Sequence, residues 1–184
     1  MRRFAIVLIA TLIASVAQAE TSAQFTMPGV RAPDDPNVSS FRFSLLYGKA
    51  DSVKGLDLGL ASFSETGDFS GFSFIMGIAH ATGTTKGCLC SLINLHEGKQ
   101  TGVGVAFVNT AKDVSEGGNV GFVNFTDGRS SWDVGGLSMS DSSNVQVGFI
   151  NVTERIDKLQ IGFLNMADNG FFKFFPFFNY PKKD

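Results

Sequence analysis

The chain repeats a short pattern of apolar and polar positions along most of its length. The stretch VQVGFIN (145–151) recurs as LQIGFLN (159–165): apolar, any residue, apolar, Gly, two apolars, Asn. With the Gly counted as position 0, weaker copies extend back to residue 44 and forward to residue 179, and the ten copies lie 13–18 residues apart. A near-constant period of this length indicates a repeat architecture.

Small residues dominate position 0, and Asn dominates position +3. The residues at position 0 are Ser44, Gly59, Gly77, Ser91, Ala106, Gly121, Gly135, Gly148, Gly162 and Pro176. Those at position +3 are Tyr47, Ser62, His80, Asn94, Asn109, Asn124, Ser138, Asn151, Asn165 and Asn179. The structural repeat positions that we single out are Gly121, Asn124, Gly148, Asn151, Gly162, Asn165 and Asn179.

Apolar residues alternate with other residues before the Gly, at positions −3 and −1. Alternation with a period of two predicts a strand with one buried face, and we expect the apolar residues to be on that face. Positions +1 and +2 are both apolar, as in Phe149 and Ile150, which breaks the alternation. Either the chain bends at this point, or both faces of the strand are covered; a Gly at position 0 permits a bend or a close contact between strands.

Two all-β architectures fit one domain of about ten strand-turn copies. In a β-solenoid each copy is one coil, the Asn residues stack into a hydrogen-bonded ladder, and the Gly residues permit close stacking. In an antiparallel meander closing into a small barrel, the polar segments between copies are hairpin turns. Turn sequences such as Asp127-Gly128 and Asn169-Gly170 favour the meander. The constant phase of Gly and Asn favours the solenoid, because only parallel stacking gives every copy the same environment.

The N-terminus has the layout of a secretory signal peptide. Arg2 and Arg3 precede an apolar run, and Ala17-Gln18-Ala19 is a small-x-small cleavage site. The sequence therefore predicts a signal peptide (1–19), a Pro-containing leader (20–40), the β-repeat domain (41–180) and a polar tail (181–184). We expect the leader to be mobile or to form a partial cap.

Charge narrows the choice of partners. Removing residues 1–19 takes away two arginines and no acid, which leaves 13 Lys and Arg against 17 Asp and Glu, a net charge of −4. No basic block is present, so the sequence predicts no nucleic-acid partner. We expect an exported protein of the periplasm, outer membrane or cell surface, with an envelope or surface partner, and membrane association stays open.

The residue types that carry chemistry are few. We expect His80 to be a corner residue and His96 a solvated turn residue, because neither has a second His or an acidic cluster at ligand spacing. Cys88 and Cys90 are two apart and should face the same side, as buried hydrophobic residues rather than a disulfide. The sequence predicts no catalytic, cofactor-binding or metal site.

The Phe-rich end, FFKFFPFFNY (171–180), has two interpretations. An aromatic terminal strand is typical of membrane barrels, but Pro176 interrupts it. We therefore expect a capping strand whose Pro blocks further pairing at an open end.

The units VQVGFINV and LQIGFLNM, with FFKFFPFFNY, resemble the GLQIGLIN-type repeats of an uncharacterised bacterial cell-surface repeat family. That resemblance implies an envelope location. The spacing also resembles the 14-residue β-roll repeat in heads of trimeric autotransporter adhesins, except for the bulky apolars after the Gly. We expect a non-enzymatic envelope protein whose repeat domain is a structural or interaction surface. The alternative is a small outer-membrane β-barrel or a lipid-binding protein.

Overall fold

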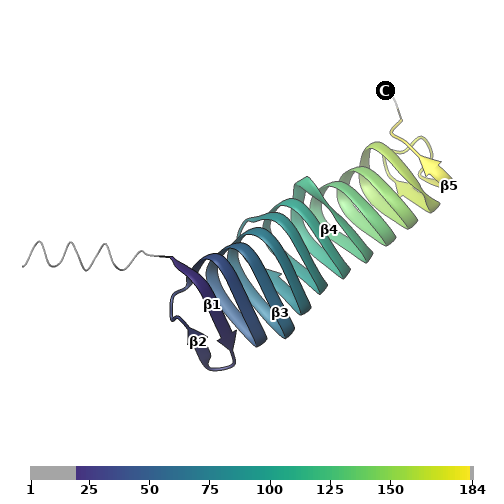
Figure 1. Ribbon diagram of the computed structural model, residues 1–184. Coiled ribbons are helices and arrows are strands. Elements are labelled where there is room, and N and C mark those ends of the chain that lie inside the picture. Colours follow the sequence, from purple (N-terminus) through teal and green to yellow (C-terminus); the bar gives the residue numbers. More distant parts are fainter. Residues whose placement is uncertain (1–19, 183–184) are drawn as a thin grey trace, which may run out of the picture.

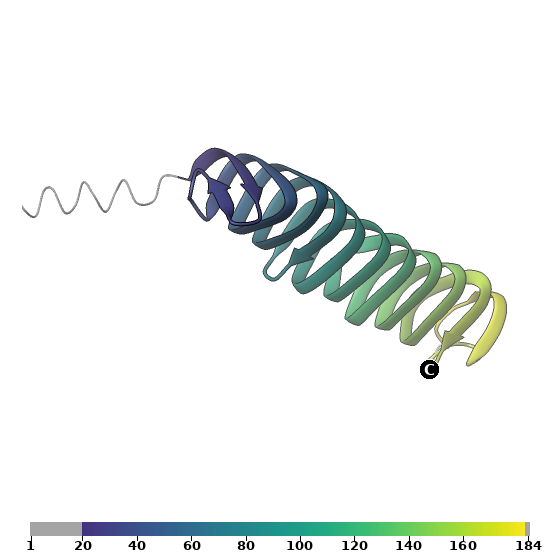
Figure 2. The ribbon, with the colours of Figure 1, turned by 90° about the horizontal axis from the view of Figure 1, so that it is seen from below.

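The computed structural model describes residues 20–182, which form a β-solenoid. Successive coils stack along one axis into a rod, with the N-terminal coil at one end and the C-terminal coil at the other (Figures 1 and 2). The solenoid prediction is confirmed, and the alternative of a meander closing into a barrel is wrong. The signal peptide predicted at residues 1–19 lies outside the described residues, as do residues 183–184.

Five strands make up one sheet in the order β2-β1-β3-β4-β5. The pairings β1–β3 and β3–β4 are parallel, as a solenoid requires, whereas β2 and β5 pair antiparallel at the two ends. Because pairing continues around the corners, β3 and β4 each run through several coils. The strands are β1 (Thr21–Met27), β2 (Val30–Ala32), β3 (Asn37–Ala81), β4 (Thr85–Ala167) and β5 (Phe174–Asn179).

Glycines at position 0 stack directly on one another. A Cβ added to Gly162 would overlap the carbonyl oxygen of Gly148; Gly148 stands in the same relation to Gly135, and Gly135 to Gly121. Each pair is 13 or 14 residues apart, which is one coil. The column therefore has no room for side chains between coils, and Gly permits the close approach of the backbones.

The Asn residues at position +3 form a buried ladder inside the rod. Asn94 Nδ2 donates to Asn109 Oδ1 at 2.9 Å, and Asn109 Nδ2 donates to Asn124 Oδ1 at 2.9 Å. Near the C-terminus, Asn151 Nδ2 donates to Asn165 Oδ1 at 2.8 Å. All five side chains are 0% exposed. The predicted Asn ladder is present, and each amide joins neighbouring coils.

A second ladder at position −2 was not expected. Asn119 Nδ2 donates to Asp133 Oδ1 at 3.2 Å, and Gln160 Nε2 donates to Gln146 Oε1 at 2.8 Å. These four side chains are also 0% exposed. The sequence did carry the signal, because the "any residue" of both clear copies is Gln.

The interior is mainly polar, so the prediction that each strand buries its apolar side is wrong. Residues at position −1, expected in the core, point outward, and so do those at position +1: Val134 is 40% exposed and Phe107 is 62% exposed. The residues inside are mostly amides and hydroxyls, many of which bond to one another, and an apolar cluster around Val53, Phe69 and Ile75 lies in the N-terminal coils. The alternation of buried and exposed side chains shifts by one residue after position +1: Phe149 is exposed, Ile150 is half-buried and Asn151 is buried. This pattern fits the predicted bend and not a strand covered on both faces.

Three N-terminal copies are out of phase with the prediction. Ser62 Oγ donates to Ser44 Oγ at 2.9 Å, whereas Tyr47, the predicted partner of Ser62, stacks on Phe63. Ala79 pairs with Asn94, which places His80 one residue outside that column. Ile75 and not Gly77 pairs with Ser91, and a register shift lies between Ile75 and Ile78. These coils are longer, and the additional residues move the phase.

The leader (20–40) is folded and belongs to the rod, so of the two alternatives expected for it the partial cap is the one that forms. β1 pairs in parallel with the start of β3, and β2 folds back on β1 as the terminal strand. The β-repeat domain therefore begins before residue 41. Gln24 Nε2 donates to the carbonyl oxygens of Pro33 and Asp35, which fixes the loop after β2.

At the other end β5 is a capping strand, as predicted, but it is not a tenth coil. It pairs antiparallel with β4, with Ile161 opposite Phe178 and Gly162 opposite Phe177. Asn179 is buried and donates to Gln160 Oε1 at 3.4 Å and to the Phe172 carbonyl oxygen at 3.0 Å. Asn179 therefore extends the Gln ladder and does not belong to the Asn column, because reversing the strand changes which columns meet.

Candidate interaction surface

The outward apolar residues line up, coil after coil, on one side of the rod. Positions −1 and +1 supply two columns, and position +4 supplies a third beyond the bend. We call this surface the apolar face. It comprises Leu60, Phe72, Phe74, Met76, Leu92, Val105, Phe107, Phe122, Phe125, Val134, Met139, Val147, Phe149, Ile161, Phe163, Met166, Phe174 and Phe178, all of which are exposed.

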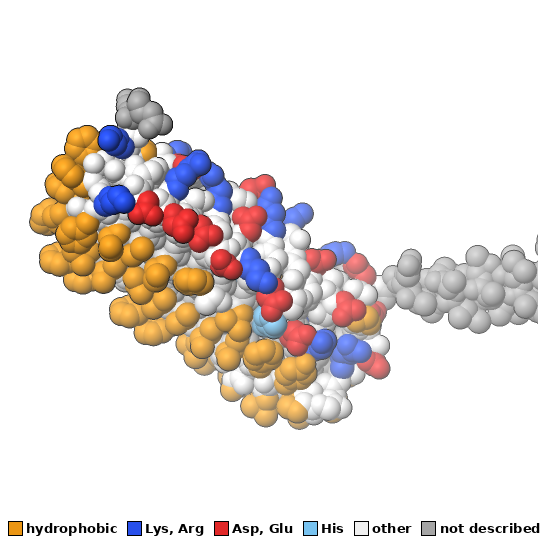
Figure 3. Space-filling model, turned by 180° about the vertical axis from the view of Figure 1, so that it is seen from behind, with side chains coloured by type: hydrophobic (Ala, Val, Ile, Leu, Met, Phe, Trp, Pro, Cys, Tyr) orange, Lys and Arg blue, Asp and Glu red, His pale blue; other side chains and the backbone are white. Residues whose placement is uncertain are grey.

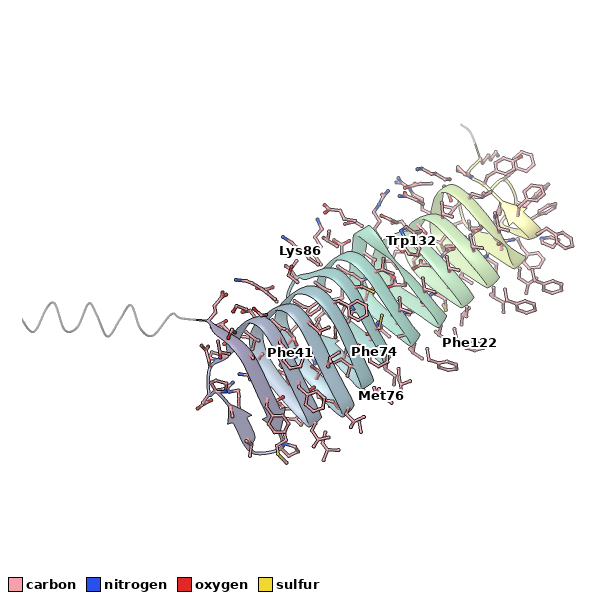
Figure 4. The ribbon with its side chains drawn as sticks, in the orientation of Figure 1. Phe41, Phe74, Met76, Lys86, Phe122 and Trp132 are labelled. Carbon is pink, nitrogen blue, oxygen red and sulfur yellow. The ribbon has the colours of Figure 1, made fainter. Side chains whose placement is uncertain are left out.

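The apolar face is an unbroken band along the rod, and charged side chains gather beside it (Figure 3). The sequence imposes this separation. From Ser91 to Gly162, positions −3 to +5 of the six copies contain only one Asp, Glu, Lys or Arg, Asp133, and its side chain is buried. The remaining charges lie in the short segments between copies. In Figure 4, Met76 and Phe122 project from the opposite side to Lys86.

Aromatic rings stack along the face. The Phe107 and Phe122 rings have centroids 5.2 Å apart and planes within 9°, and those of Phe149 and Phe163 lie 5.0 Å apart within 5°. These distances are close to the spacing of neighbouring strands in a sheet. Gly136 occupies position +1 of the coil between these two pairs, so the stacked rings form two short ridges along the rod.

The C-terminal cap extends the same face. Phe178 lies beside Ile161, and Phe174 lies beside Met166, so β5 continues the outward columns of the last coil. Five ring contacts link Phe171, Phe172, Phe175, Phe178 and Tyr180 into one cluster. Phe177 is 68% exposed. The cap therefore covers the edge of the sheet but leaves most of its rings in contact with solvent.

The apolar face is large for a single chain. Eighteen side chains that are each about half exposed present on the order of 1,500 Å² of apolar surface, since one large side chain offers roughly 150–250 Å². The largest apolar patch on a typical monomeric protein covers roughly 300–600 Å². Larger exposed patches are typical of surfaces through which proteins bind other proteins or membranes.

Several basic residues on the opposite side pair with acidic residues one or two coils away. Lys49 Nζ lies 2.7 Å from Glu65 Oε1, Lys99 Nζ lies 2.6 Å from Glu116 Oε1, and Arg129 pairs with Asp157. The bond to Lys99 and its positive charge lower the pKa of the exposed Glu116 carboxyl. The charged side is therefore mixed in sign and has no basic stripe.

Cys88 and Cys90 face the same side, as predicted, but they are half-buried in the outer surface and not in the core. Their Sγ atoms lie 3.5 Å apart as free thiols. Burial, followed by the hydrogen bond to Cys88, raises the pKa of the Cys90 thiol to about 11. At neutral pH this thiol stays protonated, which makes it a poor nucleophile.

His96 is buried, so its predicted place as a solvated turn residue is wrong. The side chain points inward at position +5, where it is 4% exposed, and its Nε2 has no hydrogen-bond partner. Burial, assisted by His80, lowers the pKa of His96 to about 4, so the ring is neutral at pH 7. His80 lies at the surface, where its Nε2 is 3.1 Å from Glu97 Oε1.

Two buried acids stand in different surroundings. Asp57 forms a bidentate ion pair with Arg42, at 2.9 Å to Nε and 2.6 Å to Nη2, inside an N-terminal coil. Asp133 has no cation beside it. Burial raises the pKa of Asp133 to about 6, although hydrogen bonds such as the one from Asn119 oppose the shift. Both carboxyl groups bond to other residues inside the rod and are not accessible to a substrate.

Among residues 20–182, no group of three or more His, Cys, Asp or Glu residues is placed to hold a metal ion. The described part of the chain also contains no helix that is long and apolar enough to cross a membrane. Comparisons with family models, with curated proteins and with solved structures gave no match.

Proposed function

We propose that this chain is an exported, non-enzymatic protein of the bacterial envelope, and that the solenoid is a rigid scaffold presenting the apolar face to another molecule. The observation that carries the proposal is the reversal of inside and outside. Large apolar side chains occupy the outer columns, whereas most of the buried residues carry amides or hydroxyls.

The energetics support an interaction surface. Covering apolar area stabilises a complex by roughly 25 cal/mol per Å², before the costs of association are subtracted. The polar side chains do not point toward a substrate, because Asn109, Gln146 and their equivalents are buried and bonded to one another. Paired charges on the other side argue against a nucleic-acid partner. The apolar face is the one large surface left for recognition in the described part of the chain.

The experiment is cysteine labelling in intact cells that express the whole chain. Cys88 and Cys90 are replaced by Ser, and one new thiol is introduced by Phe107→Cys on the apolar face or by Lys112→Cys on the charged side. A maleimide that enters the periplasm but not the cytoplasm is added, and labelling is measured before and after denaturation.

We expect Lys112→Cys to react in the cell and Phe107→Cys to react only after denaturation, because a partner covers the apolar face. Equal labelling of both thiols in the cell would mean that the face is free, which contradicts the proposed interaction. A failure of Lys112→Cys to react before denaturation would contradict export.

A further inference from the structure

The apolar face extends along the whole rod, and this length restricts what can cover it. A typical stable complex buries roughly 800 Å² on each partner, which is about half of the surface that the face presents. A compact partner of ordinary size would leave much of the face in water. The occupant must be elongated and apolar over the same length.

The relief of the face restricts the occupant further. Within each of the two short ridges, the stacked rings are one coil spacing apart, as the 5.2 Å and 5.0 Å centroid distances show. Ridges fit grooves over a long contact only when both surfaces have the same repeat. Stacked sheets pack about 10 Å apart, and identical columns can interdigitate as a dry interface.

The charges around the face do not suit a lipid surface. A protein segment that lies on an anionic bilayer combines an apolar side with flanking Lys and Arg. Here the chain from residue 20 onward has a net charge of −4, and Lys99 and Arg129 are paired with acids. Mixed charges of this kind are compatible with a neighbouring protein chain.

The ends of the rod are closed to growth by strand pairing. β2 pairs with the last three residues of β1 at the N-terminal edge, and β5 covers the C-terminal edge and carries Pro176, which has no backbone N–H to donate. Association through the side of the rod is therefore favoured over end-to-end stacking.

We propose that the occupant of the apolar face is a second copy of this chain, bound face to face as a two-fold symmetric dimer. A copy has the required length, repeat and apolar character by construction. Two-fold symmetry places the same surface on both partners and closes the assembly at two chains. The inference rests on the proposed function, since it names the partner of that same face.

The test is sedimentation velocity on residues 20–184 without detergent. The chain should sediment as a dimer at micromolar concentration. The triple variant Leu92→Glu, Phe122→Glu, Phe149→Glu places charges on alternate coils of the face and should be monomeric. The control triple variant Lys86→Glu, Lys112→Glu, Lys158→Glu changes the net charge more but leaves the face intact, and it should stay dimeric.

Folding is followed by circular dichroism. If the apolar-face triple variant does not fold, Phe122→Glu alone should still raise the dissociation constant at least tenfold. A monomeric wild-type chain overturns the proposal, as does a series of larger aggregates with no discrete dimer. A monomer that binds vesicles of phosphatidylethanolamine and phosphatidylglycerol identifies a lipid surface as the occupant and also overturns it.

The two proposals fail in different ways. A monomer in solution whose Phe107→Cys variant is protected in cells contradicts the dimer and leaves the interaction face supported. A dimer in solution whose Phe107→Cys variant reacts freely in cells contradicts the role of the face in the envelope.

Discussion

Asn124 shows how the interior of the rod is stabilised one residue at a time. Its Oδ1 accepts from Asn109 at 2.9 Å, and its Nδ2 donates to the Val134 carbonyl oxygen at 3.0 Å and to Ser138 Oγ at 3.4 Å. Removing such a side chain leaves buried groups on two neighbouring coils without a partner. Unsatisfied buried groups cost more than a hydrogen bond contributes.

We therefore expect Asn124→Ala to lower the free energy of unfolding by about 1–3 kcal/mol, measured by urea denaturation. Asn124→Ser is the matched comparison and should cost less, because Ser138 already continues the column with a hydroxyl. Equal and negligible losses for both variants would show that water satisfies the column.

The pKa shifts of buried His96 and Asp133 predict opposite dependences of folding stability on pH. The folded pKa of His96 is about 4, below its ordinary 6.5, so the unfolded chain binds the proton first and stability falls as the pH drops from 6.5 to 4. The folded pKa of Asp133 is about 6, above its ordinary 3.8, so the folded chain keeps the proton and stability falls as the pH rises from 4 to 6. The two effects offset each other in the wild-type chain.

Single variants should separate the pH effect of His96 from that of Asp133. Acidification from pH 6.5 to 4 should destabilise Asp133→Asn relative to wild type by on the order of 2–3 kcal/mol, because the His96 effect is then unopposed. The same acidification should stabilise His96→Gln by a similar amount. Urea titrations at several pH values test both, and profiles parallel to that of wild type would mean that neither group is buried.

At the scale of the coil, the Gly column sets how closely neighbouring backbones approach. A Cβ at position 148 would overlap the Gly135 carbonyl oxygen, so Gly148→Ala should force the coils apart locally. Overpacking of this kind costs about 1–3 kcal/mol. In the same column, Ala106→Gly should cost about 1 kcal/mol, from the greater entropy of the unfolded chain and the loss of one buried methyl group. Thermal melting that ranks the two variants in the reverse order would contradict the close contact.

The end strand β5 protects the last coil from pairing with other molecules. Deleting residues 171–184 exposes the β4 edge around Gly162, and such edges recruit other strands. We expect the truncated chain to aggregate, as measured by light scattering. Phe177→Ser, which keeps the edge paired, should remain dispersed. A truncated chain that stays dispersed and cooperatively folded would show that β5 is not needed to cover the edge.

The sequence was sufficient to predict the coils and their columns but not which side of the strand faces the core. Stacked parallel coils reproduce the chain period directly, so Gly148 and Asn151 fall where a count of 13–15 residues places them. A period of two defines two faces without saying which is inside. In a rod this narrow, amides such as Gln146 and Asn151 can fill the core by bonding to their equivalents, and apolar residues are not required there.

The ends and the early coils were harder to predict for a related reason. The bulge between Ile75 and Ile78 shifts the phase without leaving a mark in the pattern, so His80 was placed in the wrong column. The reversal of β5 is equally hidden, because FFPFFN keeps the spacing of a tenth copy while it runs antiparallel.

At the scale of the whole molecule, the rod has an apolar side and a charged side, so association is favoured through the apolar side. The core is stabilised by hydrogen bonds that the apolar face does not share, so charges can be introduced on the face without altering the ladders. This independence makes the Glu variants of the face informative about association. It also means that dimer formation and folding stability should respond to different substitutions.

Small-angle X-ray scattering of residues 20–184 tests architecture and assembly together. About ten copies at the ~4.8 Å strand spacing give a rod roughly 45–50 Å long. A dimer formed through the apolar face keeps that length and doubles the mass per unit length, whereas end-to-end stacking doubles the length at constant cross-section. We expect the wild type to have about twice the cross-sectional mass of the apolar-face triple variant, with a similar length. A squat, hollow particle would contradict the solenoid, and a rod of doubled length would contradict the side-by-side dimer.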